Sequence, residues 1–182
     1  RDAPPDAPVD GNDLDVETLR AVAPEVILTQ TGCGTRGVDE DLVSRHLDDL
    51  PVDPAVVGLG ARSLGDVYDC IREVAEVVDR AERAADLVGQ LQDCVDTVRQ
   101  FTSGTSDRPS VVVLERLDPV HVAANWVPEL VDAAGGTYPL ADPGERSRKV
   151  EWATVRDVDP DVLVVAPCGV DAATTHANRH EL

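Results

Sequence analysis

The 182-residue sequence has no methionine, two tryptophans, two tyrosines, one phenylalanine and a single lysine, Lys149. It has no apolar run near the roughly 20 residues that a membrane-spanning helix needs. Its four cysteines form no Cys-x-x-Cys pair, which argues against a zinc knuckle. It contains no GxSxG motif, no HExxH motif and no phosphate-binding glycine loop, so no catalytic motif of these kinds points to an enzyme.

Acidic residues dominate what is present. The chain has 35 Asp and Glu against 16 Lys and Arg, a formal net charge of −19. A surface of this sign repels phosphates, so we expect no nucleic-acid partner. The aspartate content, the scarce lysine and the small apolar side chains favour a halophilic protein, whose acidic surface stays hydrated in concentrated salt.

The longest pattern runs from Ser63 to Phe101 without a proline. Its apolar residues recur every three or four positions, which predicts one amphipathic helix. Ser63 and Asp66 have the spacing of a capping box at its start. A coiled coil is the alternative, but the strand-like runs Ala55–Leu59 and Val111–Leu114 on either side favour a helical spine between two α/β lobes.

Shorter patterns predict the remaining elements. We expect helices at Asp15–Val22, Asp39–Leu47, Asn125–Ala134 and Val150–Val158, strands at Val26–Thr29, Ala55–Leu59, Ser110–Glu115 and Val162–Val165, a loop at Leu117–Ala124, and a frayed end around His176 and His180. Gly135-Gly136 is a typical helix stop.

A weak internal repeat suggests that the two lobes are related. Shifted by 136 positions, Leu14–Gln30 lies over Val150–Ala166, with five identities in 17 positions and the same helix, proline turn and strand. The lobe partners of the strands at Ser110 and Ala55 would fall outside the chain, so we expect a fragment truncated at both ends or a shortened relative.

The expected fold is therefore α/β, with two Rossmann-like lobes that have parallel sheets and are joined by one long helix. The expected division is residues 1–61, 62–103 and 104–182. Ligands bind outside the carboxyl ends of parallel strands, so the candidate binding segments of a cleft shared by the lobes are Gln30–Gly34, Arg116–Trp126, Arg146–Trp152 and Pro167–Gly169.

Several residues in these segments allow two interpretations. Trp126 and Trp152 offer a flat face to a planar ligand or pack in the core. Cys33 and Cys168 either contact a ligand or are passive loop residues. His121 could bind a metal or be an exposed loop residue.

One basic cluster stands out in this acidic chain. Arg146 and Arg148, together with Ser147 and Lys149, are candidates for holding an anionic substituent.

The stretch Val112–Gly136 resembles the cobalamin-binding proteins of the BtuF-like group, which are substrate-binding proteins of ABC transporters of the class with a long linker helix. The resemblance rests on L-D-P, W-V-P-E-L-V and A-G-G in this stretch, on S-R-x-V-x-W, D-P-D and A-P-C-G in Ser147–Gly169, and on P-x-x-I-L-T-Q followed by a cysteine in Pro24–Cys33. Arg116 departs from a frequent tryptophan, and Ala124-Asn125 from a Gly-His pair.

The resemblance implies capture of cobalamin or a related corrinoid and its delivery to an ABC transporter permease, without catalysis, catalytic cofactor or structural metal. It implies an extracytoplasmic protein, associated with the membrane only through a tether or the permease, although a cytoplasmic role stays open. Carried over by motif, the ligand-binding residues are Gln30, Cys33, Asp118, Trp126, Arg148, Trp152, Cys168 and Gly169.

Three alternatives remain. The same fold could bind haem or a ferric siderophore. The chain could be a chelatase-like enzyme, for which His121 is the one candidate proton acceptor. It could also be a truncated scaffold without a ligand.

Overall fold

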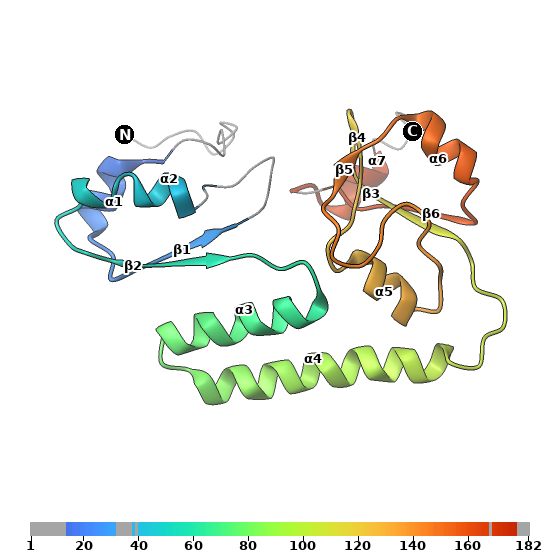
Figure 1. The fold of residues 1–182 in the computed structure, drawn as a ribbon, viewed down its shortest axis with the longest axis horizontal. Helices are drawn as coiled ribbons and strands as arrows, with labels where there is room; N and C mark the ends of the chain where they lie inside the picture. The colour runs from blue at the N-terminus through green and yellow to red at the C-terminus, as the bar shows by residue number, and fades with distance from the viewer. Residues whose placement is uncertain (1–13, 32–37, 39, 168, 178–182) are drawn as a thin grey trace. The chain divides into compact units, whose positions relative to one another are not determined.

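The computed structural model describes residues 14–31, 38, 40–167 and 169–177, and every structural statement below concerns these residues. Helices alternate with strands along the chain, so the predicted α/β class is confirmed (Figure 1). The chain divides into two compact units: Arg1–Gly60 with Asp69–Ala84 form the first, and Ala61–Tyr68 with Ala85–Leu182 form the second.

The first unit holds a two-stranded parallel sheet. Its elements are α1 (Val16–Val22), β1 (Val26–Gln30), α2 (Glu40–Ser44), the 3₁₀ helix η1 (Leu47–Asp49) and β2 (Ala55–Leu59). The pairing runs from Val26 opposite Ala55 to Gln30 opposite Leu59. β2 has its predicted bounds and β1 is one residue longer. The helix predicted over Asp39–Leu47 is shorter in the structure, because the chain tightens into a 3₁₀ turn after Ser44.

The predicted single helix is wrong in one respect. The chain forms α3 (Leu64–Val77) and α4 (Ala81–Thr102), with a break at Asp79. Asp79 has a positive φ of 54°, its amide donates to Glu76, and the Arg80 amide donates to Ala75 at 2.7 Å. These bonds form a Schellman motif, which ends a helix with a left-handed residue, and Asp tolerates that conformation better than most residues. The capping box at Ser63 is confirmed: the Asp66 amide donates to Ser63 Oγ and the Ser63 amide to Asp66 Oδ2, both at 3.0 Å.

The second unit holds a four-stranded mixed sheet in the order β5-β4-β3-β6. Its elements are β3 (Val111–Leu117), β4 (Val120–Val122), α5 (Val127–Ala133), β5 (Arg148–Lys149), α6 (Trp152–Val158), β6 (Val162–Val165) and α7 (Ala172–Ala177). β6 pairs parallel with β3 as predicted, but β4 is antiparallel to both β3 and β5. The loop predicted over Leu117–Ala124 is therefore wrong, and a helix at Ala172–Ala177 replaces part of the predicted frayed end.

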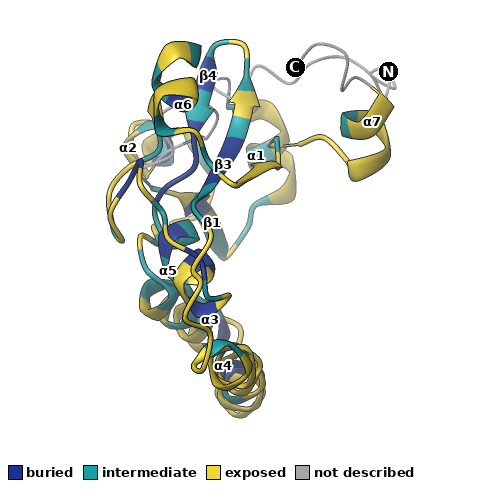
Figure 2. Ribbon diagram, turned by 90° about the vertical axis from the view of Figure 1, so that its right-hand side faces the viewer, coloured by how far each residue is buried: buried dark blue, intermediate teal, exposed yellow. Residues whose placement is uncertain are grey.

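The second unit builds its core on the two faces of β3. Val112 and Leu114, both 0% exposed, pack with Val120, Val122 and residues from α6 on one face, and Val113 packs with Val131 on the other. Figure 2 shows this burial along β3 and β4, whereas most of α4 is exposed. The side-chain alternation of a strand explains the two clusters.

The internal repeat is confirmed in the backbone. α1 and α6 begin and end at positions exactly 136 apart, and β1 and β6 begin at positions with the same offset. Ala23 and Asp159 follow the two helices with almost identical left-handed angles, φ 47° and ψ 60° against φ 48° and ψ 60°.

Candidate functional site

The carboxyl ends of three strands of the second unit lie at one edge of its sheet. β3 and β6 are parallel, and β5 runs in the same direction because both β3 and β5 are antiparallel to β4. Asp118 follows β3, Trp152 lies just beyond β5, and Gly169 follows β6, so the topology brings these three predicted site residues to the same edge. Asp118 and Gly169 are exposed, as a ligand-binding role requires.

Trp126 is not brought to that edge by the sheet. β4 runs back from Asp118, opposite the direction of β3, and α5 follows it. Trp126 stands at the N-cap of α5 without a side-chain cap bond and is half-buried. Asn125, the residue predicted to cap this helix, instead has a positive φ of 55°, and its amide donates to the Glu145 carbonyl at 2.8 Å.

Trp152 and Arg148 are both anchored to the body of the second unit. Trp152 packs against the core cluster of Val112 and Leu114, so part of its surface has the packing role considered above. Arg148 is exposed, and its Nη2 donates to the Leu140 carbonyl at 2.9 Å. Its neighbour Ser147 donates its hydroxyl to Glu115 Oε2 at 3.0 Å and accepts the Ala124 amide at 3.1 Å. These bonds hold the segment before β5 against β3 and β4.

Tyr138 is a residue that the sequence analysis missed. Its hydroxyl donates to the carbonyls of Val113, at 3.2 Å, and Ala123. Burial, with a smaller contribution from the Glu115 carboxylate, raises the pKa of Tyr138 to about 12. Tyr138 therefore fastens the segment after α5 to β3 and β4. An isolated tyrosine in an irregular stretch carries no sequence signal for this role.

His121 is not the exposed loop residue that the sequence allowed. It is half-buried within β4, and its Nδ1 lies 2.9 Å from the Pro119 carbonyl oxygen. Because a carbonyl only accepts, Nδ1 donates in this bond. The described residues include no group of three or more His, Cys, Asp and Glu arranged to hold a metal ion.

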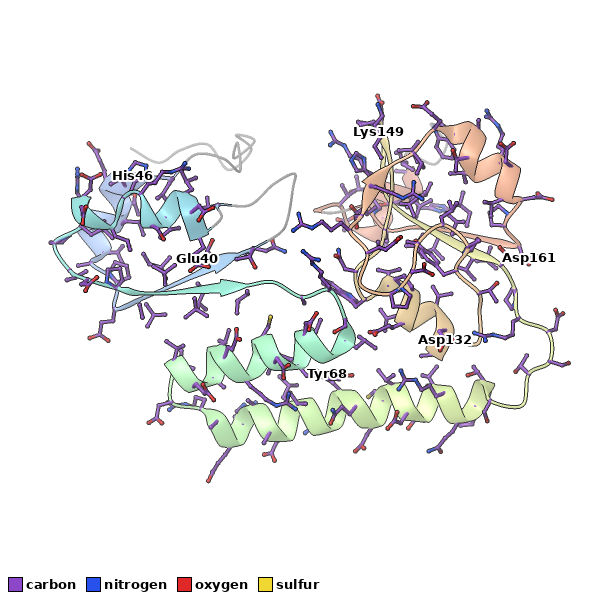
Figure 3. All side chains as sticks on the ribbon, in the orientation of Figure 1. Glu40, His46, Tyr68, Asp132, Lys149 and Asp161 are labelled. Carbon is purple, nitrogen blue, oxygen red and sulfur yellow. The ribbon has the colours of Figure 1, made fainter. Side chains whose placement is uncertain are left out.

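The remaining predicted site residues belong to the first unit or lie outside the described residues. Gln30 ends β1 and is exposed at the carboxyl end of that strand. Cys33 and Cys168 lie outside the described residues. In the same unit, Gly58 of β2 leaves room for α2: a Cβ there would come within 2.5 Å of the Glu40 carboxylate, and Figure 3 labels Glu40 above β2.

The W-V-P-E-L-V segment has a structural role that is visible in its contacts. Glu129 of α5 accepts the Leu64 amide at 2.6 Å, so it caps the start of α3. At the other end of α5, the Gly135 amide donates to Asp132 and the Gly136 amide to Val131, which confirms the predicted helix stop. A Cβ on Gly136 would lie 2.9 Å from Val131 and 3.0 Å from Val111.

An open cavity of about 250 Å³ lies elsewhere in this unit, between the end of α4 and α5. Arg108 and Asp132, joined by an ion pair of 2.6 Å, form part of its lining (Figure 3 labels Asp132). It lies near the amino end of β3, away from the carboxyl ends of the strands, so we do not assign the ligand to it. None of the described helices combines the length and apolar character that crossing a bilayer requires.

Three solved structures illustrate what the chain is similar to. S. aureus IsdE complexed with haem has 16% identity and a TM-score of 0.71, and the match covers 93% of this chain and 64% of that one. The Fe³⁺-hydroxamate transport system from Saccharomonospora viridis has 26% identity and a TM-score of 0.68, covering 92% and 58%. The vitamin B12-binding protein BtuF of Vibrio cholerae has 14% identity and a TM-score of 0.65, covering 94% and 66%.

The chain thus spans 58% to 66% of the length of these three proteins. No curated protein sequence matches it. The sequence profile of the periplasmic binding protein family, by contrast, matches residues 8–181, nearly the whole chain. This chain therefore belongs to the periplasmic binding protein family.

Proposed function

We propose that this chain acts in the substrate-binding component of an ABC importer, outside the cytoplasmic membrane, and that it captures cobalamin or a related corrinoid for a permease. Family membership over residues 8–181 is the observation that supports the binding role. The corrinoid is favoured by the resemblance of Val112–Gly136 and Ser147–Gly169 to the BtuF-like group. No catalytic step is part of this proposal.

The proposed ligand surface uses the residues predicted from the sequence. In the second unit, Asp118, Trp152 and Gly169 share the carboxyl edge of the sheet, and Arg148 lies on the neighbouring β5. Trp126 supplies a half-buried aromatic face at the start of α5. In the first unit, Gln30 is at the equivalent end of β1. Cys33 and Cys168 complete the proposed set.

Haem or a ferric siderophore is the alternative ligand. The specific observation in its favour is that solved structures of similar fold include a protein complexed with haem and an Fe³⁺-hydroxamate transport system. Haem or a ferric siderophore would use the same proposed surface as a corrinoid. The side chains of that surface, and not the fold, decide which of these ligands binds.

Parallel titrations with hydroxocobalamin, haemin and a ferric hydroxamate test the proposal. Binding is read by calorimetry and by the visible spectrum of each chelate. Tight binding of hydroxocobalamin alone supports the corrinoid, and Trp126→Ala should then weaken it several-fold, since an aromatic contact contributes about 0.5–1.5 kcal/mol.

Phe101→Ala is the matched control, because Phe101 is 84% exposed near the end of α4 and lies outside the proposed surface. Preference for haemin or the hydroxamate would replace the corrinoid by the alternative. A folded chain that binds none of the three would contradict both.

A further inference from the structure

Three basic residues lie side by side across the sheet of the second unit. The strand register pairs Arg116 of β3 with His121 of β4, and His121 with Lys149 of β5. Directly paired residues project from the same face of a sheet. Val120 and Val122, which flank His121, are buried in the core cluster of Leu114, so the three basic side chains lie on the opposite face. We name Arg116, His121 and Lys149 the basic row.

Folding stability does not explain the basic row. Arg116 and Lys149 lie on either side of His121 with no carboxylate between them, although this chain has, beside only 16 Lys and Arg, 35 acidic residues that could have neutralised them. Within the described part of the chain, the ion pairs of the structure involve other residues, and none joins a member of the row to a carboxylate. The acidic neighbour in β3, Glu115, has its Oε2 engaged by the Ser147 hydroxyl at 3.0 Å.

The side chains of the row are held so that polar groups remain available. Arg116 Nε donates to the Asp118 carbonyl at 3.1 Å, which fixes the guanidinium, and its terminal nitrogens make no hydrogen bond to another described residue. The His121 bond to Pro119 uses Nδ1 and leaves the Nε2 edge. Lys149 is exposed, and Figure 3 shows its side chain reaching outward.

The spacing of the row suits one small anion. Neighbouring strands lie about 4.8 Å apart, so the backbones of β3 and β5 are separated by about 10 Å. The long side chains of Arg116 and Lys149 can converge above His121 across that distance. Arginine and lysine both recognise carboxylates and phosphates through charge-assisted hydrogen bonds.

We propose that the basic row binds an anionic oxygen group, a carboxylate or a phosphate, on a small ligand. Its place in ligand recognition rests on the proposed function, because Arg116 lies two residues before Asp118 near the carboxyl end of β3, and Lys149 ends β5. A corrinoid can carry such a group as a phosphodiester, and haem or a siderophore as a carboxylate. The basic row binds this anionic group and so favours ligands that carry it.

A large polyanion is a poor partner for the same residues. The net charge of −19 repels an extended anionic surface. A small anion senses mainly the charges within the Debye length of about 8 Å at physiological salt, so it is less affected by the net charge of the whole chain.

The first test is a titration of the ligand-free chain with inorganic phosphate at constant ionic strength. Binding is measured by NMR, from the chemical shifts of the backbone amides of β3, β4 and β5. We expect saturable shifts at millimolar phosphate, and about tenfold weaker binding in Lys149→Gln and in Arg116→Gln. Arg156→Gln, which removes one exposed positive charge on α6, is the matched control and should bind phosphate like the original chain. Shifts that fail to saturate, or that are equal in all variants, overturn the anion site.

The second test uses pairs of ligands that differ in the anionic group: haemin with its dimethyl ester, and cyanocobalamin with dicyanocobinamide. Lys149→Gln should weaken only the anionic member, and equal loss for both members overturns the selective role. If phosphate binds through the row but no chelate binds, the anion site stands and the proposed function fails. Binding to phosphatidylglycerol vesicles that depends on Lys149 would replace the small ligand by a membrane surface.

Discussion

The two copies of the internal repeat share a backbone but not an environment. Leu19 of α1 and Val155 of α6 occupy equivalent positions, yet Leu19 is half-buried and Val155 is 4% exposed in the core of the second unit. The two strands that follow have partners of very different character: Val165 of β6 pairs with Leu114, and its equivalent Thr29 of β1 pairs with Gly58. Local sequence therefore encodes the helix–turn–strand unit, whereas partners elsewhere in the chain decide how much of it is buried.

Leu114→Ala should lower the free energy of unfolding more than any other substitution proposed here. Leu114 is 0% exposed in the core cluster, so its truncation removes apolar contacts and leaves a cavity. We expect a loss of about 3 kcal/mol in the free energy of unfolding, measured by urea denaturation and circular dichroism. Leu28→Ala in β1 is the control, since Leu28 is 46% exposed and should lose less than about 1 kcal/mol. An equal loss in both variants would mean that the cores of the two units are equivalent.

Tyr138→Phe removes a hydrogen bond between side chain and backbone that fastens the second unit. The loss should be about 1–2 kcal/mol at neutral pH, because the Ala123 carbonyl loses the Tyr138 hydroxyl as its donor, whereas the Val113 carbonyl still accepts the Ala123 amide at 2.9 Å. Tyr68→Phe is the control, since the Tyr68 hydroxyl makes no hydrogen bond to another described residue.

The effect of Tyr138→Phe on stability should depend on pH. Burial raises the pKa of Tyr138 to about 12 in the folded chain, above its ordinary value of 10.0. The unfolded chain therefore releases this proton first, and the stabilisation that Tyr138 provides is complete below pH 10 and is lost as the pH rises towards 12. The difference in unfolding free energy between the original chain and Tyr138→Phe should narrow between pH 9 and pH 12. A difference that stays constant across this range would contradict the shifted pKa.

Substituting the left-handed residue that follows each repeat helix should have a smaller effect on stability, and this effect should differ between the two units. Ala23 and Asp159 adopt almost the same positive φ. This conformation is sterically unfavourable for alanine, whereas aspartate tolerates it better. Ala23→Gly should stabilise the first unit by about 0.5–1 kcal/mol, and Asp159→Gly should stabilise the second unit by less. Hydrogen exchange, read separately for the two units, measures both. Equal gains would show that residue type does not distinguish the two turns.

The smallest expected effect concerns the starts of the same helices. Asp15 caps α1 by accepting the Thr18 amide at 2.9 Å, whereas Glu151, its equivalent before α6, makes no side-chain cap bond. The hydrogen bond from the Thr18 side chain lowers the pKa of Asp15, so its contribution persists above the ordinary value of 3.8 and fades as the pH falls through the lowered value. Asp15→Ala should lower protection from hydrogen exchange in α1 at pH 6, and Glu151→Ala should leave α6 unchanged. A comparable loss in α6 would contradict the assigned difference in capping.

Strong local patterns were enough to predict much of the fold. β2 and β6 have their predicted bounds, and the helix from Asp15 to Val22, the capping box at Ser63 and the stop at Gly135 are present. The break at Asp79 was hidden because the apolar period of the sequence continues through it. β4 escaped prediction because three residues after a proline carry too short an alternation to distinguish a strand from a loop.

The candidate site was harder to predict from the sequence than the fold, because its residues are brought together by strand pairing. Sequence order placed Asp118 and Trp126 in one segment, but β4 runs back from Asp118 before the chain reaches Trp126 at the start of α5. The roles of Tyr138 and of the basic row depend on partners between 5 and 33 positions apart in the chain, such as Arg116 with His121 and Arg116 with Lys149 across β4. Only the strand register brings these residues together. The assignments of Gln30, Cys33, Asp118, Trp126, Arg148, Trp152, Cys168 and Gly169 to a ligand stay predictions.

The irregularity in the β3–β4 pairing has an evolutionary consequence. Leu114 lies opposite Val122, but the register then shifts, so Arg116 and not Glu115 lies opposite His121. A descendant that lost Arg116 would regain uninterrupted pairing and place the carboxylate of Glu115 beside the imidazole, whereas loss of Glu115 would keep Arg116 there. A single codon deletion would thus reverse the charge at the centre of the sheet while leaving every buried valine in place. Deletion at this point therefore offers relatives a second route to a new ligand preference, beside substitution of Arg116.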